Sequence, residues 1–147
     1  MRTIALRFSN NFAPKEGTIS AHEAVIAEKG FVWYGKLGSR ISRKAKADIL
    51  ENNDPRILLI HSGAIARYWA HLDMIQNELP PASEIPSYYR ERAKNFSTWF
   101  RITSFEVAPR DILAHCSVAS SGTSLSIASR HSMNPYFIID YDNNSGE

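Results

Sequence analysis

The amino-acid sequence predicts an α+β fold in which a small, curved and mostly antiparallel sheet or barrel is flanked by helices. Three observations lead to this prediction. Strand-like and helix-like segments alternate in the first half of the chain, strand-like segments dominate the second half, and hydrophobic residues make up 44% against 22% charged residues. At 147 residues the chain fits a single domain, which we expect over residues 1–141 with a flexible tail over 142–147.

The first half of the chain carries clear starts and ends for its elements. Ser20 and Glu23 form a capping box, which predicts a helix start, and Gly30 can end that helix in the left-handed conformation. Ser42 is the expected N-cap of a second helix, whose first turn is basic. Hydrophobic periodicity completes this half, and the expected elements are a strand over 3–8, a helix from Ser20, a strand over 31–34 and a helix over 43–51.

The second half is dominated by strands. The continuous apolar run over 57–60 is typical of a strand buried on both faces, and the next strand is its expected antiparallel partner. Neighbouring residues of a strand point to opposite faces, so we expect Tyr68 in the core and Trp69 at a surface or pocket edge. The remaining elements are strands over 66–75, 98–107 and 136–141 and helical turns over 109–113 and 124–130.

Several classes of protein are excluded by the composition. No apolar run approaches the roughly 18 residues of a membrane span, and the first eight residues lack a secretory signal, so we expect a cytoplasmic protein without a membrane partner. The single cysteine, Cys116, rules out an internal disulfide and a Cys-rich zinc site. The histidines show no metal spacing and no local nucleophile motif occurs, so no catalytic residue, metal or cofactor is expected.

The order of these motifs resembles the PUA-related superfamily, and within it the EVE and YTH branches, with ASCH domains as more distant relatives. The resemblance covers roughly residues 2–135 and is carried by Ile4–Asn10, Val32–Tyr34, Arg56–Gly63, Tyr68–Asp73, Trp99–Ile102 and the loop Ser120–Gly122. It implies a pocket that holds a flipped or unpaired base, often a modified one, in an aromatic cage beside a basic surface. YTH domains usually take a second tryptophan from the loop that corresponds to residues 78–87, which has none here; either Tyr88 or Tyr89 replaces it or the cage is incomplete.

Residues that would bind the base are of two kinds. Aromatic side chains stack on a base with about 1–3 kcal/mol each, and Trp33, between a buried strand and a glycine turn, is the best platform. Hydroxyl and amide groups in turns read base edges through hydrogen bonds. The expected base-binding residues are Trp33, Tyr34, Ser9, Asn10, Asn11, Ser62, Trp69 and Tyr88.

A basic segment follows this strand on a chain whose net charge is only +2. Six cations and no acid occur from Lys29 to Lys46. Cations neutralise phosphates and give salt-sensitive binding with little sequence information, so the expected partner is DNA or RNA carrying a modified base. The expected phosphate-binding residues are Lys36, Arg40, Arg43, Lys44 and Lys46.

Two alternatives from other functional classes stay open. The first is a small ASCH-like hydrolase acting on a modified nucleoside or amide, for which the resemblance implies a lysine, a threonine and a glutamate such as Lys36, Thr103 and Glu106. The second is a protein-interaction module of a defence or stress system, in which the aromatic residues meet an effector protein. Steep salt dependence of binding would separate the nucleic-acid hypothesis from the second alternative.

Overall fold

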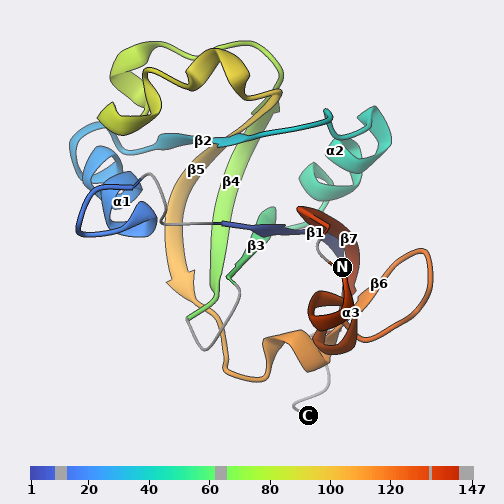
Figure 1. Cartoon of the computed structure of the whole chain (residues 1–147). Coiled ribbons are helices and arrows are strands. Elements are labelled where there is room, and N and C mark those ends of the chain that lie inside the picture. The colour runs from blue at the N-terminus through green and yellow to red at the C-terminus, as the bar shows by residue number, and fades with distance from the viewer. Residues whose placement is uncertain (9–12, 62–65, 133, 143–147) are drawn as a thin grey trace.

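The computed structural model describes residues 1–8, 13–61, 66–132 and 134–142 (Figure 1). The α-helices and strands in chain order are β1 (Arg2–Arg7), α1 (Thr18–Lys29), β2 (Val32–Lys36), α2 (Arg43–Leu50), β3 (Arg56–Ile60), β4 (Tyr68–Gln76), β5 (Thr98–Val107), β6 (Cys116–Val118), α3 (Leu125–His131) and β7 (Tyr136–Tyr141). Within these ranges, four short 3₁₀ helices complete the fold, at η1 (Ala82–Glu84), η2 (Ser87–Tyr89), η3 (Ala93–Asn95) and η4 (Ile112–His115). Within this part of the chain, no helix is both long and apolar enough to cross a membrane.

All seven strands belong to one sheet with the order β2-β5-β4-β3-β1-β7-β6. The pair β1 and β3 is parallel, with Ala5 opposite Leu58, and the other neighbours are antiparallel. The prediction of an α+β fold with a mostly antiparallel sheet is therefore confirmed. The antiparallel pairing of the strand at 57–60 with the next strand is confirmed as well.

The sheet curls around an inner core, so that strands far apart in its order approach each other. The ammonium group of Lys36, at the end of β2, lies 4.4 Å from the ring centroid of Tyr136, at the start of β7. In Figure 1, β1 and β2 run across the long strands β4 and β5, with α1 and α2 on either side. The inner core contains Ile4, Leu6, Val32, Tyr34, Ile57, Leu59, Leu72, Phe100 and Ile102 from the sheet and Ile19, Ala45 and Ile49 from α1 and α2.

The outer face of the sheet is also buried, in two separate layers. Beneath α3 and η4, one layer contains Ala5, Leu58, Ile60, Trp69, Ile112, Leu125, Phe137 and Ile139. Beneath η1 to η3, the other contains Trp33, Ile85, Tyr89, Ala93 and Trp99. Trp69 is only 3% exposed, so its expected position at a surface or pocket edge is wrong. Tyr68 packs against the inner core, as predicted.

The ends of the helices agree only in part with the sequence motifs. Gly30 ends α1 with φ 87° and donates its N–H to Ile26 O over 2.7 Å, and the side chain of Ser42 caps α2 by accepting from Ala45 N over 3.0 Å. Both predictions are confirmed. The prediction that the helix starts at a capping box on Ser20 is wrong. The helix α1 begins two residues earlier, after Gly17, which has φ 93°.

Candidate nucleic-acid interface

An aromatic cluster fills the region between α1, β2 and the segment of 3₁₀ helices. Its centre is the ring of Tyr89, whose centroid lies 4.9 Å from that of His22, 4.9 Å from that of Tyr88 and 4.7 Å from that of Phe96. The members of the aromatic cluster are His22, Trp33, Tyr34, Tyr88, Tyr89, Phe96 and Trp99. They come from β2, from β5, from α1 and from the segment of 3₁₀ helices.

His22 is the polar centre of the aromatic cluster. It is fully buried, and its Nδ1 lies 2.8 Å from the Thr18 carbonyl oxygen, which can only accept, so Nδ1 carries the proton. The other ring nitrogen, Nε2, is buried and has no hydrogen-bond partner among the described residues. Burial lowers the pKa of His22 to about 4, which keeps the ring neutral. The cluster therefore encloses a bare hydrogen-bond acceptor.

Trp33 and Tyr34 enter the aromatic cluster from opposite faces of β2. The indole Nε1–H of Trp33 donates to Glu84 Oε1 over 3.0 Å, and the side chain is only 4% exposed. Tyr34 points into the inner core with its ring centroid 4.9 Å from that of His22, and burial raises its pKa. Because β2 is the first strand in the sheet order, Tyr89 can reach around its edge, and its ring centroid lies 6.4 Å from that of Tyr34.

The partly buried residues Tyr88 and Phe96 form the outer part of the aromatic cluster. The Tyr88 hydroxyl donates to Thr18 Oγ1 over 3.4 Å, and burial raises its pKa. Phe96 lies directly on Gly35, where a Cβ atom would come within 2.6 Å of the ring. A glycine at this position therefore lets the ring of Phe96 pack flat against β2.

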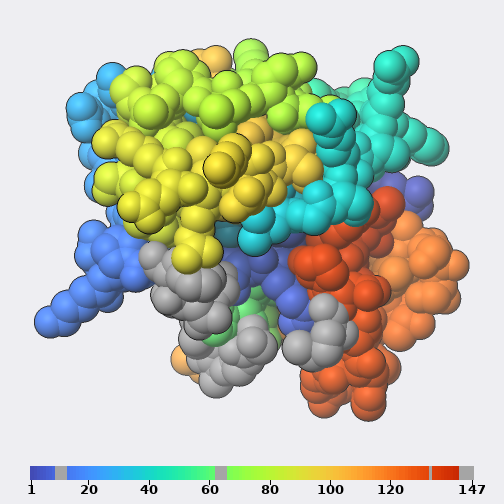
Figure 2. All heavy atoms as spheres, turned by 45° about the horizontal axis from the view of Figure 1, so that its top comes forward, coloured from blue at the N-terminus to red at the C-terminus, as the bar shows by residue number. Residues whose placement is uncertain are grey.

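Exposed cations follow β2 along the chain. Arg40 and Arg43 are exposed on the loop after β2 and on the first turn of α2. On the face shown in Figure 2, the loop after β2 (cyan) lies beside the segment of 3₁₀ helices (green to yellow), and Ser97 N donates to Lys36 O over 2.8 Å between them. Lys44 forms an ion pair with Asp48 at 3.1 Å.

Comparison with known proteins decides the family of the chain. A family model described as Pua-like matches residues 4–142. The chain belongs to the Pua-like family. No curated protein and no solved structure matches it significantly.

Of the base-binding residues predicted for this Pua-like domain, the structure brings together Trp33, Tyr34 and Tyr88. Trp69 lies in the separate layer under α3, with the Arg56 guanidinium 4.5 Å from its ring centroid. Four of the predicted residues, Ser9, Asn10, Asn11 and Ser62, lie outside the described residues. Sequence reasoning missed His22, whose only signal was a histidine near the start of a helix, four residues after Thr18.

Lys36 does not belong to the exposed basic surface of the Pua-like domain. It is only 2% exposed and donates from Nζ to the carbonyls of Leu37 (3.0 Å) and Ser39 (2.6 Å). The ring of Tyr136 contacts the same ammonium group, so the contacts of this group are made within the protein. The predicted phosphate-binding role requires an exposed ammonium group, whereas this buried side chain closes the barrel and fixes the turn after β2. Lys46 is half-buried and donates to Asn77 Oδ1 over 3.0 Å.

The residues implied for an ASCH-like hydrolase are not assembled in this Pua-like chain. Lys36 pairs with Thr98 at the start of β5, whereas Glu106 follows eight residues later on the same strand. At about 3.3 Å per residue the two are roughly 25 Å apart along β5. Glu106 instead contacts His71 Nε2 and lies 3.7 Å from Arg56. These three side chains therefore cannot act on one substrate atom.

Proposed function

We propose that this chain binds nucleic acid and accommodates one flipped or unpaired, modified base in the aromatic cluster, as a reader of the EVE and YTH type. Membership of the Pua-like family points to nucleic-acid binding in general. The cluster adds the feature that a base requires, namely several aromatic faces that can replace the stacking lost when the base leaves its neighbours.

The observation that carries the proposal is the unpartnered Nε2 of His22 inside the aromatic cluster. A buried acceptor without a partner costs about 1–3 kcal/mol, and a ligand N–H that reaches it recovers this energy. An exocyclic amino group or a ring N–H of a base is such a donor. An unpaired polar atom of this kind also penalises a ligand that lacks the donor, which is a basis for selectivity.

Entry of the base requires the outer rings to move. Tyr88 and Phe96 are only partly buried and belong to a segment of single-turn 3₁₀ helices outside the sheet. Such segments open at lower free energy than strands in the middle of a sheet. The base displaces these two rings outward and stacks against Tyr89, which is buried, and Trp33, which is anchored by its hydrogen bond to Glu84.

The phosphates next to the flipped base lie on the exposed cations. Arg40 and Arg43 supply guanidinium groups on the loop after β2 and at the start of α2. Contacts of this kind fix the position of the strand and add affinity that falls with salt. The side chains of Ser9, Asn10, Asn11 and Ser62 stay candidates for reading the edges of the base.

Fluorescence anisotropy with short single- and double-stranded DNA and RNA, with and without methylated or hydroxymethylated bases, tests the proposal at two salt concentrations. We expect salt-sensitive binding that tightens for one modified base. His22→Leu, which keeps the volume but removes the acceptor, should reduce that preference by on the order of tenfold. His131→Leu, an exposed histidine on α3, is the matched control. Absence of binding to every probe, or an unchanged preference in a folded His22→Leu variant, contradicts the proposal.

A further inference from the structure

The edge of the sheet beside β7 is only half covered. β6 is three residues long and pairs with Ile139–Tyr141, so it does not reach the first half of β7. The other side of β7 is fully paired with β1, from Tyr136 opposite Leu6 to Asp140 opposite Arg2. The stretch Tyr136–Ile138 is therefore a strand edge with one neighbour.

The direction of the backbone groups on this edge follows from the hydrogen bonds around it. Arg7 N donates to Pro135 O over 2.9 Å, and Tyr141 N donates to Met1 O over 2.8 Å. Residues of an antiparallel pair alternate between pointing at the partner strand and pointing away. The backbone polar groups of residues 135, 137, 139 and 141 therefore point toward β1, and those of Tyr136 point away from it.

The backbone groups of Ile138 also point away from β1, and its carbonyl accepts a hydrogen bond from Ala119 N over 2.9 Å. Three backbone groups remain on this side, the N–H and C=O of Tyr136 and the N–H of Ile138. None of them has a partner among residues 1–8, 13–61, 66–132 and 134–142. A C=O followed two residues later by an N–H on one edge forms an acceptor next to a donor.

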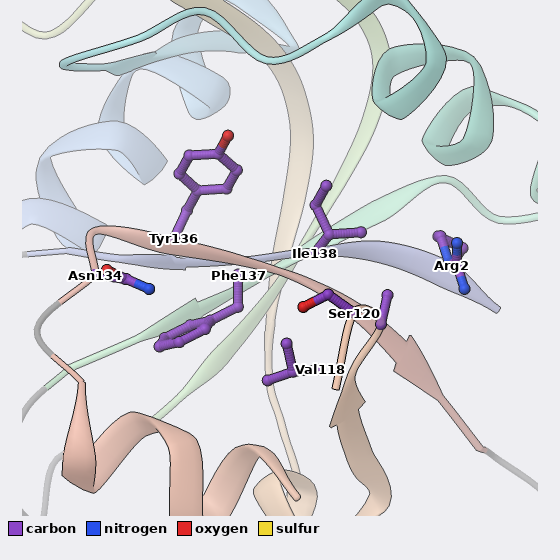
Figure 3. A pocket seen from close by; sticks show the side chains of 8 residues that line it. Arg2, Val118, Ser120, Asn134, Tyr136, Phe137 and Ile138 are labelled. Atoms are coloured by element: carbon purple, nitrogen blue, oxygen red, sulfur yellow. The ribbon is translucent and has the colours of Figure 1, made fainter. Parts of the chain in front are cut away.

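A hollow of about 440 Å³ lies along this edge, within the size range of small-ligand sites. Figure 3 shows Tyr136 and Ile138 on one side of the sheet plane and Val118 and Phe137 on the other. Ser120 and Asn134 line the hollow at its polar positions. A flat ring placed against the edge would continue the plane of the sheet, with side chains above and below it.

We propose that this hollow binds a second unpaired nucleobase, one whose edge carries an amino donor beside a ring-nitrogen acceptor, as adenine does. The amino N–H donates to the Tyr136 carbonyl and the ring nitrogen accepts from the Ile138 N–H. This site rests on the proposed function and extends it, because it would hold a base of the same strand on the other side of the Lys36–Tyr136 contact.

The edge is better suited to a base than to an added peptide strand. Peptide strands gain affinity from a long ladder of main-chain hydrogen bonds, and this edge offers three groups that have no partner among the described residues. The Ala119–Ile138 hydrogen bond closes one end of the edge. At the other end, the next outward-pointing residue, Asn134, is already engaged, because its N–H donates to Ser132 Oγ over 3.2 Å and its carbonyl accepts from Arg7 Nε over 2.9 Å. A planar heterocycle needs only the adjacent acceptor and donor.

Amide NMR spectra of the full chain, titrated with AMP and separately with IMP, test this site. IMP carries the reverse pattern on the same edge, a carbonyl acceptor beside an N–H donor. We expect AMP to shift the Ile138 amide downfield and to slow its hydrogen exchange, and IMP to leave it unchanged. Equal shifts with both nucleotides, or shifts only with a strand-forming peptide, overturn the proposal.

Two substitutions localise the effect. Ser120→Tyr fills the hollow and should weaken AMP binding at least tenfold, whereas Ser121→Tyr, at the neighbouring exposed position, should not. Ile138→Pro removes the free N–H without removing a hydrogen bond to β1, and should have the same effect as Ser120→Tyr. Unchanged AMP affinity in a folded Ser120→Tyr variant refutes the site. His22→Leu should leave the AMP shift at Ile138 intact, so failure of this site and failure of the aromatic cluster are distinguishable.

Discussion

The ammonium group of Lys36 lies 4.4 Å from the ring centroid of Tyr136, and this contact joins the first strand of the sheet order to the sixth. The same group donates hydrogen bonds to two carbonyls of the turn that follows β2. One side chain therefore closes the barrel and holds the turn that follows β2. Lys36 is thus a structural residue next to the proposed interface.

Replacing Lys36 with methionine should lower the stability of the fold. The substitution keeps most of the aliphatic stem but leaves the Leu37 and Ser39 carbonyls without their donor and removes the contact with Tyr136. We expect a loss of about 1–3 kcal/mol in the free energy of unfolding, measured by urea denaturation. Lys44→Met, at an exposed ion pair, should change it by less than about 0.5 kcal/mol.

His22 should make the stability of the protein depend on pH below neutrality. Its pKa is about 4 in the folded state and 6.5 in the reference state, because burial disfavours the charged ring. Above pH 6.5 the ring is mostly neutral in both states, so its titration does not change the stability. Between pH 6.5 and 4 the unfolded chain binds a proton that the folded protein does not, so stability falls by about 1.4 kcal/mol per pH unit.

The variant His22→Leu isolates this effect. Between pH 7 and pH 5 the wild-type protein should lose about 2 kcal/mol more than the variant, measured by urea denaturation at the two pH values. Other groups titrate equally in both proteins and cancel in the difference. A constant difference between the two proteins would mean that His22 is not buried as a neutral ring.

A methyl group at position 35 should disrupt the packing between β2 and the segment that covers it. The Cβ of Gly35→Ala would lie 2.6 Å from the Phe96 ring, which has to move. Overpacking of this kind costs about 1–3 kcal/mol. The double variant Gly35→Ala with Phe96→Ala should cost less than the sum of the two single variants, because the ring that clashes is absent. Additive costs in thermal unfolding would argue against this contact.

Removal of the two exposed arginines should weaken binding of every nucleic acid by a similar factor. Arg40→Ala with Arg43→Ala removes two phosphate contacts, so the slope of log affinity against log salt should decrease by about 2. Arg110→Ala, an exposed arginine beside η4, is the matched control. Loss of affinity for one base only, with an unchanged salt slope, would contradict a phosphate-binding role for these arginines.

The single thiol should be unreactive in the folded protein. Cys116 is 2% exposed, and burial raises its pKa to about 12, so the thiolate that reacts with thiol reagents is absent near neutral pH. We expect no labelling by DTNB in native buffer and complete labelling in denaturing guanidinium. Cys116→Ser gives the background. Rapid labelling of the native protein would show that β6 opens easily.

Local sequence patterns were sufficient to predict most of the elements. The apolar run at 57–60, the Ser42 cap and the Gly30 terminus each depend on residues that are close in sequence, and all three are confirmed. β6 was missed, since a three-residue strand carries too little periodicity. Ser20 was misleading because a capping box also occurs inside a helix, and the positive φ of Gly17 decides the start.

Burial of individual site residues could not be predicted in the same way. Alternation along its strand predicts Trp69 at a surface, but α3 and η4 cover that face of the sheet as well. The basic segment predicts a phosphate-binding role for Lys36, but the side chain is buried against Tyr136, which is 100 positions away in sequence. The buried acceptor of His22 depends on rings from α1, β2 and η2, a combination that exists only after folding.

The position of β1 between β3 and β7 in the sheet has a consequence for biosynthesis. β1 is translated before the other strands of the sheet, and one of its two neighbours, β7, pairs with it across a separation of up to 138 residues. While the ribosome is still making the chain, one edge of β1 is therefore open beside the apolar side chains of Ile4 and Leu6. An open apolar edge is a site for mispairing with another chain. Nascent chains that stop before residue 136 should therefore depend on chaperones, and the sheet should be completed only after the segment 136–141 has left the ribosome.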